Sequence, residues 1–147
     1  MEEINLQCIN ATIENSEDVY HLLCELEHIE LDKASFEEIF RKNVINPDIH
    51  YLLAMDNQNI IGFASLHIQS LLHHVSKVAE IQEIVVSKHY QGQGVGQILF
   101  NRLKEIAIEN ECALLEVCCN QIREKSHEFY LKQNMKNSHY KFTLSLR

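Results

Sequence analysis

Apolar and polar positions follow strand or helix periodicities along most of the chain, which predicts a regular order of elements. Residues 4–9 alternate apolar and polar side chains, as a half-buried strand does. An amphipathic helix is expected to begin near Ser16. A second helix is expected from Ser35, whose hydroxyl can form a capping box with Glu38, and to end before Pro47.

The rest of the chain also reads as strands and helices separated by polar turns. After Pro47 the order strand, polar turn, strand predicts a hairpin over residues 51–71. A further strand runs into a cluster of glycines, after which an amphipathic helix begins at Val95. The remaining predicted elements are strands at 79–86, 113–119 and 142–146 and a helix at 126–133.

This order of elements, βααβββαβαβ, predicts a fold of the α/β (α+β) class. The second to fourth strands follow one another through turns, which favours antiparallel pairing, whereas the strand, helix, strand connection across residues 86–113 requires a parallel pair. We therefore expect a mixed sheet with about four helices on its faces. Because no linker, repeat or low-complexity tract interrupts the chain, residues 1–147 are expected to form a single domain.

Composition and charge narrow the classes of function. The chain has 46% apolar and 23% charged residues, which is typical of a soluble globular protein. No apolar run reaches the roughly 20 residues that cross a bilayer, and the N-terminus is acidic rather than basic, so we expect a cytoplasmic protein without membrane contact. The net charge of -8 disfavours nucleic acid as a partner. Five cysteines without a Cys-x-x-Cys pair indicate neither a disulfide framework nor a zinc site.

A glycine-rich segment, Gln-Gly-Gln-Gly-Val-Gly at residues 91–96, lies between a predicted strand and a predicted helix. Successive backbone N–H groups and the helix dipole create an anion site in this setting, so the segment is expected to hold a pyrophosphate. The alternative is a tight turn that only starts the helix. The segment matches neither the Walker loop nor the dinucleotide fingerprint Gly-x-Gly-x-x-Gly, because the required lysine and the required spacing are missing.

The same segment resembles the Gln/Arg-x-x-Gly-x-Gly/Ala signature of the GCN5-related N-acetyltransferases, the GNAT family, which follows a strand ending like residues 83–86. A second family segment, a short helix bearing Phe-Tyr, is matched by residues 126–131. Most relatives continue with glycine, whereas this chain has Asn134, the next-best residue for a left-handed helix cap. The resemblance covers essentially the whole chain.

This resemblance implies the GNAT fold and an N-acetyltransferase activity. The amine of a small molecule would attack the thioester of acetyl-CoA directly. Residues 67–75, 80–83 and 138–143 are further similar to the bacterial aminoalkylphosphonate N-acetyltransferases. The acceptor implied by this narrower resemblance is an aminoalkylphosphonate.

Acetyl transfer requires a base, because an alkylamine with a pKa of about 10.4 is protonated at neutral pH. By the resemblance, Glu80 occupies the position of the base in some relatives, and Glu83 lies nearer the thioester. Residues three apart in a regular strand face opposite sides, so both serve one site only if the strand bulges between them, as it does in the family. Either carboxylate can act through water, and each alone can instead be a solvated surface group.

Tyr130 of the Phe-Tyr helix is the candidate acid for the departing CoA thiolate, although a tyrosine on an amphipathic helix is more often a packing residue. Further residues are expected, by the resemblance, to bind the coenzyme. They are Ile84, Val85 and Val86 through backbone N–H groups, Gln91, Gly92, Gln93, Gly94, Val95 and Gly96 of the loop, Asn120 toward pantetheine, and Arg123 toward phosphate.

Four histidines are candidates for binding the acceptor: His67, His73, His74 and His139. A divalent metal that polarises a phosphonate is compatible with such a set, but no standard metal spacing is present and no metal is predicted. The alternative is a surface hairpin that carries histidines, because neighbours in a strand point to opposite faces.

Two other functions stay open. An aminoglycoside or polyamine acetyltransferase would use the same chemistry on a polycation, which the surplus of acidic residues suits. A non-catalytic CoA sensor would keep the glycine loop without a working base and acid. Dimers are common in the family, so a homodimer is a further expectation.

Overall fold

A computed structural model describes residues 5–147, and Ile4, where the first predicted strand begins, lies outside the described residues. The chain divides into two compact units, one ending at Glu116 and one comprising Val117–Arg147. The expectation that residues 1–147 form a single domain stays a prediction. No helix within residues 5–147 is both long enough and apolar enough to cross a membrane.

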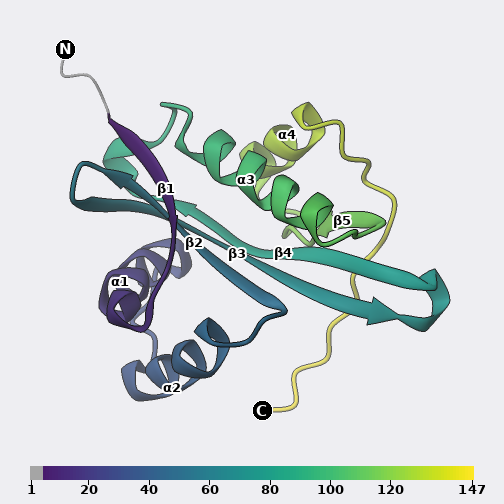
Figure 1. Ribbon diagram of the computed structural model, residues 1–147, viewed down its shortest axis with the longest axis horizontal. Helices are drawn as coiled ribbons and strands as arrows, with labels where there is room; N and C mark the ends of the chain where they lie inside the picture. Colours follow the sequence, from purple (N-terminus) through teal and green to yellow (C-terminus); the bar gives the residue numbers. More distant parts are fainter. Residues whose placement is uncertain (1–4) are drawn as a thin grey trace. The chain divides into compact units, whose positions relative to one another are not determined.

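The observed elements follow the predicted order from the first strand to the last helix (Figure 1). Short 3-10 helices follow β1, β3 and β4. The elements are β1 (Leu6–Asn10), α1 (Ser16–Glu27), α2 (Lys33–Val44), β2 (Ile49–Asp56), β3 (Asn59–Leu71), β4 (Ser76–Val86), α3 (Val95–Glu109), β5 (Leu114–Val117) and α4 (Glu124–Lys132).

The strands form one sheet in the order β1-β2-β3-β4-β5, in which β1 to β4 pair antiparallel. Ala113, just before β5, donates its N–H to the carbonyl of Lys77 near the start of β4, at 2.9 Å. The two strands therefore begin side by side, as expected after a helical crossover. The predicted mixed sheet with four helices is confirmed.

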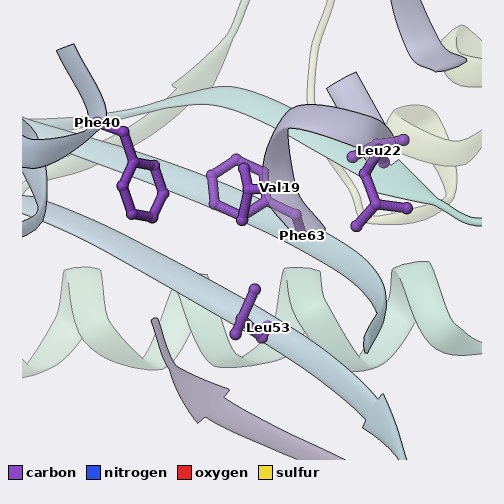
Figure 2. Packing of buried hydrophobic residues seen from close by; sticks show 6 residues of the cluster. Val19, Leu22, Phe40, Leu53 and Phe63 are labelled. Carbon is purple, nitrogen blue, oxygen red and sulfur yellow. The ribbon is translucent and has the colours of Figure 1, made fainter. Parts of the chain in front are cut away.

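Helices α1 and α2 cover one face of the sheet, and α3 covers the other (Figure 1). The apolar side chains of α1 recur at helical spacing, so they point to one side and pack on the sheet. Figure 2 shows the resulting cluster between the helices and the strands. Its buried members are Val19, Leu22, Phe40, Leu53, Phe63 and Val85.

The opposite face depends on a close approach between α3 and β3. A Cβ built on Gly62 would lie 3.2 Å from Cδ1 of Leu99 and 3.3 Å from Cβ of Ala54. These distances are tight for carbon atoms, so glycine allows the helix to pack closely there. Leu99 and Leu103 of α3 are fully buried as a result.

The predicted last strand is wrong. Residues 133–147 form no helix or strand, and Phe142, Leu144 and Leu146 are 92%, 83% and 89% exposed. Alternating apolar and polar residues give a strand one apolar face. The backbone N–H and C=O groups of a strand also require a neighbouring strand as a hydrogen-bond partner. Among the described residues the sheet contains only β1 to β5.

The predicted cap of the second helix is also wrong. α2 begins at Lys33, and the side chain of Asp32 accepts from the backbone N–H of Ser35. The Ser35 hydroxyl donates to the same carboxylate. Aspartate before the first turn satisfies a free amide and complements the helix dipole, so the N-cap lies three residues earlier than the capping box indicated.

Candidate active site

A β-bulge in β4 determines which side chains share a face of the sheet. Ser65 of β3 lies opposite Glu83, and the next residue, Leu66, lies opposite Ile81, so Gln82 has no partner on β3. Glu80 lies opposite His67. Side chains directly opposite in an antiparallel pair point to the same face, and Ser65 and His67 are two apart in β3. The bulge therefore brings Glu80 and Glu83 to the same face, as the sequence analysis required.

Glu83 ends a row of polar side chains that crosses three strands. Tyr51 of β2 lies opposite Ser65, and Ser65 lies opposite Glu83. The hydroxyl of Ser65 donates to the carboxylate of Glu83 and accepts from its backbone N–H at 3.1 Å. The row borders the cluster between the sheet and α1 and α2, since Leu53 and Phe63 are the next residues on that face.

Tyr51 receives a hydrogen bond from α2. The side-chain amide of Asn43 donates to its phenol oxygen at 2.8 Å. Burial raises the pKa of Tyr51, the hydrogen bond from Asn43 lowers it, and the negative charge of Glu83 raises it. The phenol therefore stays protonated near neutral pH, within the electrostatic reach of Glu83.

Glu80 has a different environment on the same face. Its carboxylate accepts a hydrogen bond from the side-chain amide of Gln82, which is exposed. His67 lies opposite it on β3 and is half-buried. Glu80 is therefore held by a solvent-facing neighbour, whereas Glu83 is held by a fully buried hydroxyl.

The glycine loop has the backbone conformation that an anion site requires. Gly92 and Gly94 have φ values of 77° and 85°, and Gly94 immediately precedes α3. The first amides of a helix have no partner within the helix and point outward along its axis. With two glycines in the left-handed region, the chain can present successive amides to a pyrophosphate.

The two glutamines of the loop point back toward the preceding segment. The side-chain amide of Gln91 donates to the carbonyl of Val86 at 3.2 Å, and that of Gln93 donates to the carbonyl of His89 at 3.1 Å. These side chains shape the loop rather than reach outward. The loop conformation therefore depends on the hydrogen bonds of the two glutamine side chains as well as on the left-handed glycines.

Three other elements fix the segment between β4 and the loop. Backbone N–H of Ser87 donates to Ile61 of β3 at 2.7 Å. The Tyr90 hydroxyl donates to Asp56 at the end of β2 at 2.9 Å, and backbone N–H of Lys88 donates to Glu25 of α1 at 3.0 Å. The loop is thus preorganised by contacts within its own unit.

The side chains at the end of β4 are buried or half-buried. Val85 is buried in the cluster with Phe63, while Ile84 and Val86 are half-buried. Val95 is buried at the first position of α3, and Gly96 follows it. The buried valines anchor the two ends of the segment that was predicted to bind the coenzyme.

The second unit holds three further predicted site residues. The Asn120 side chain accepts from backbone N–H of Ile122 at 3.1 Å, so its amide oxygen is used in a local turn. Arg123 follows that turn directly before α4. Burial raises the pKa of Tyr130 to about 12, with a further rise from Cys119 and an opposing effect of the Arg123 charge. Asn134 has φ 66°, which confirms the predicted left-handed cap.

The four candidate histidines come from three different segments of the chain. His73 and His74 lie in the 3-10 turn Leu72–His74 beyond the strands, with ring centroids 4.3 Å apart, rather than in a strand as considered above. His139 lies in the second unit, where its Nδ1 is 2.7 Å from the hydroxyl of Ser138. Within residues 5–147 no three side chains of His, Cys, Asp or Glu are arranged to hold a metal ion.

An open groove of about 500 Å³ lies along α1 and the residues that follow it. It includes two carboxylates and two histidines, and one of the carboxylates is Glu25, which accepts from Lys88. The lining residues are Tyr20, His21, Cys24, Glu25, His28, Ile29 and Glu30.

Sequence reasoning missed Tyr51, Ser65 and Asn43. Ser65 interrupts an otherwise apolar run of β3, and a single hydroxyl in a buried strand requires a hydrogen-bond partner. That signal was available in the sequence. The partner was not, because the register between β3 and β4 depends on the bulge.

Comparisons with known proteins identify the family and the fold of the chain. Residues 16–135 match the model of the Acetyltransferase (GNAT) family. The chain is 40% identical over 137 residues to an aminoalkylphosphonate N-acetyltransferase of Salmonella typhimurium strain LT2, covering 93% of this chain and 89% of that protein.

Solved structures share the fold at lower identity. A transcriptional regulator from Bacillus halodurans C-125 superposes with a TM-score of 0.89 at 21% identity, over 97% of this chain and 100% of that one. An aminoglycoside acetyltransferase from an uncultured soil metagenomic sample superposes with a TM-score of 0.82 at 14% identity, over 97% of each chain.

Replacing Gly94 with alanine is expected to lower the free energy of unfolding by about 1–2 kcal/mol, because φ at this position is left-handed. A Cβ there would meet nothing within 4 Å, so the cost comes from the backbone alone. Gly94→Asn is the matched control and should cost less, since asparagine tolerates this region better. Urea unfolding without coenzyme measures both variants. Equal stability of Gly94→Ala and the wild type would contradict the assigned conformation.

Proposed function

Because the chain belongs to the GNAT family of acetyltransferases, we propose that it transfers the acetyl group of acetyl-CoA to the primary amine of an aminoalkylphosphonate. The chain is an N-acetyltransferase, and the choice of acceptor is supported by the 40% identity to the Salmonella enzyme over 93% of this chain. The observation that carries the mechanism is the bulge of β4, since it brings two carboxylates to one face beside the strand end that leads into the glycine loop.

The residues of the coenzyme site divide into two groups by the atoms that they offer. Backbone amides of the loop 91–96 would bind the pyrophosphate, with Gly92 and Gly94 supplying the conformation. Backbone N–H groups of residues 84–86 would hydrogen-bond the pantetheine arm and the thioester oxygen. Asn120 and Arg123 are the further proposed contacts, to pantetheine and phosphate. Because most of these contacts are to the backbone, they depend on conformation more than on side-chain identity.

Glu83 is the proposed general base. It accepts a proton from the ammonium group of the acceptor, directly or through water, and the free amine then attacks the thioester carbonyl carbon. The carbon–sulfur bond breaks, and the nitrogen releases its second proton to solvent. The hydrogen bonds from Ser65 orient the Glu83 carboxylate, and Glu83 adjoins residues 84–86, which are assigned to the thioester. Glu80 is held only by the exposed Gln82 and is assigned to binding the acceptor.

Tyr130 is proposed to stabilise the departing thiolate by a hydrogen bond. Its pKa of about 12 keeps the phenol protonated at every working pH. Complete proton transfer to a thiolate whose acid has a pKa of about 8.5 is uphill by about 5 kcal/mol. The phenol therefore donates a hydrogen bond while the sulfur leaves, and solvent then protonates the thiolate.

The groove on α1 is also compatible with a second class of acceptor, the aminoglycosides and polyamines. Glu25 and Glu30 suit a polycation, and the net charge of -8 would attract one. His21 and His28 in the same groove instead offer donors to an anionic group such as a phosphonate. An aminoalkylphosphonate carries both charges, whereas an aminoglycoside or polyamine uses only the carboxylates.

A homodimer is also proposed. The exposed Phe142, Leu144 and Leu146 support it, because alternating apolar residues are suited to a strand that pairs with another chain. Sedimentation of the full chain tests it, and a monomer at micromolar concentration would exclude it.

The function is tested by release of free CoA from acetyl-CoA with a panel of amines. Turnover is expected with 1- and 2-aminoalkylphosphonates and should exceed that with polyamines and aminoglycosides at equal concentration. Each assay is run with and without a divalent metal, and acetyl-CoA without amine is the control for hydrolysis. Faster turnover of polycations would favour the second class of acceptor. Tight CoA binding without turnover of any amine would contradict the enzymatic function and favour a sensor.

Replacing Glu83 with glutamine is expected to lower kcat by about 10²–10⁴-fold while KM for acetyl-CoA stays nearly unchanged, because the amide keeps the shape but accepts no proton. Glu80→Gln is the matched control on the same face and should lose less than about tenfold in kcat, with a rise in KM for the amine. Steady-state kinetics with both substrates varied distinguishes the two. A larger loss of kcat in Glu80→Gln would assign the base to Glu80.

Replacing Tyr130 with phenylalanine is expected to lower kcat about tenfold, because one hydrogen bond to the leaving sulfur is lost. The neighbouring Phe129→Leu change in the same helix serves as the packing control and should affect stability more than kcat. The alkaline side of the pH profile should be the same in wild type and Tyr130→Phe up to about pH 11, since the pKa of Tyr130 is about 12. An unchanged kcat would exclude the proposed role.

A further inference from the structure

Ser65 is the one polar residue that is fully buried among those that the structure describes. It lies in β3 between Ala64 and Leu66, which are also fully buried. Burying a hydroxyl without a partner costs about 1–3 kcal/mol. An alanine would fill this position without that cost, so the hydroxyl calls for an explanation in terms of its partners.

Both hydrogen-bond partners of Ser65 belong to Glu83. The hydroxyl oxygen accepts from the backbone N–H of Glu83 at 3.1 Å, and the hydroxyl proton is donated to the Glu83 carboxylate. The Ser65 side chain thus binds both the backbone N–H and the carboxylate of Glu83. A carboxylate tied at its main chain and at its oxygen has fewer accessible rotamers than one tied at a single point.

These hydrogen bonds occur where the ladder between β3 and β4 is interrupted. Gln82 has no partner on β3, and a bulge leaves backbone groups beside the extra residue without their regular partners. The Ser65 hydroxyl supplies an acceptor for the first amide after the bulge. It therefore supports the irregular backbone and the side chain that this backbone presents.

We propose that Ser65 is a positioning residue for Glu83. It holds the carboxylate in one rotamer by donating a hydrogen bond to it and by accepting one from the backbone of the same residue. This inference rests on the proposed function in that Glu83 is assigned there as the base. Ser65 is fully buried and its hydroxyl bonds to Glu83, so its effect on the reaction is expected to pass through Glu83.

The kinetic test compares Ser65→Ala with Ser65→Thr, which restores a hydroxyl. In Ser65→Ala we expect kcat with 2-aminoethylphosphonate to fall about 10–100-fold. The Glu83 carboxylate is no longer held in the orientation in which it accepts a proton from the amine. KM for acetyl-CoA should stay within about twofold. Ser65→Thr should regain part of the loss. Ser70→Ala, at an exposed serine of the same strand, is the control and should behave as wild type.

A second measurement is independent of turnover. In protein with ¹³C-labelled glutamate, the Glu83 carboxyl signal is assigned by its absence in Glu83→Gln. At neutral pH this signal should change position in Ser65→Ala, because the hydrogen bond from the Ser65 hydroxyl is gone, and it should stay in place in Ser70→Ala. Thermal unfolding of each variant shows whether it is folded.

The outcomes separate the inference from the function. Wild-type kcat and an unchanged Glu83 carboxyl signal in Ser65→Ala would overturn the positioning role and leave the acetyltransferase function intact. If wild-type protein acetylates no amine, the proposed function fails, and the carboxyl signal still decides whether Ser65 holds Glu83. A Ser65→Thr variant that does not fold leaves the decision to the carboxyl signal of Ser65→Ala.

Discussion

The extra residue in β4 is the constraint on which both faces of the sheet depend. In a regular strand Ile81 and Val85, four residues apart, would point to the same side. Here Ile81 lies opposite Leu66 and Val85 opposite Phe63, and these partners of β3 point to opposite faces. Both side chains are buried. Removal of the bulge would therefore move one of them out of its layer, so packing on both faces maintains it.

This coupling explains how a polar site can border a hydrophobic cluster. The bulge turns Glu83 toward the face of Leu53 and Phe63, where an unpaired carboxylate would be costly. Ser65 meets that cost in part by a hydrogen bond, and Glu83 stays half-buried rather than enclosed. The hydrophobic cluster holds the strand, and the strand holds the carboxylate. Precision of the site is thus derived from packing rather than from a network of charges.

Much of the fold could be predicted from periodicity alone. Strand and helix patterns located nine elements of the observed fold, because each buries an apolar side in the way its period dictates. The same reasoning failed for residues 142–146, where alternation describes one side of a strand but not the backbone partner that a strand needs. It also misplaced the cap of α2, because Ser35 and Asp32 are both suitable caps and only their geometry distinguishes them.

The sequence predicted the glycine loop of the candidate site well, but it predicted the residues around the two carboxylates of β4 less well. The reason is physical. The glycine loop acts through backbone conformation, so its glycines and its position before a helix mark it in the sequence. The bulge carries no such mark, since Gln82 is neither glycine nor a turn residue, and the family resemblance alone indicated it. Ser65 and Tyr51 join the site only through register across two strand pairs.

The same division accounts for how one fold can accept different amines. Backbone contacts in the loop tolerate change of side chains, as long as the left-handed positions and the anchors of the segment persist. Here those anchors come from Asp56 and Ile61, near the turn between β2 and β3, and from Glu25 of α1. Glu25 also lines the groove on α1, so the helix that bears the groove is tied directly to the segment before the loop. Replacing Glu25 would therefore change the charge of the groove and also remove the hydrogen bond that holds Lys88, whereas replacing Glu30 would change the charge of the groove.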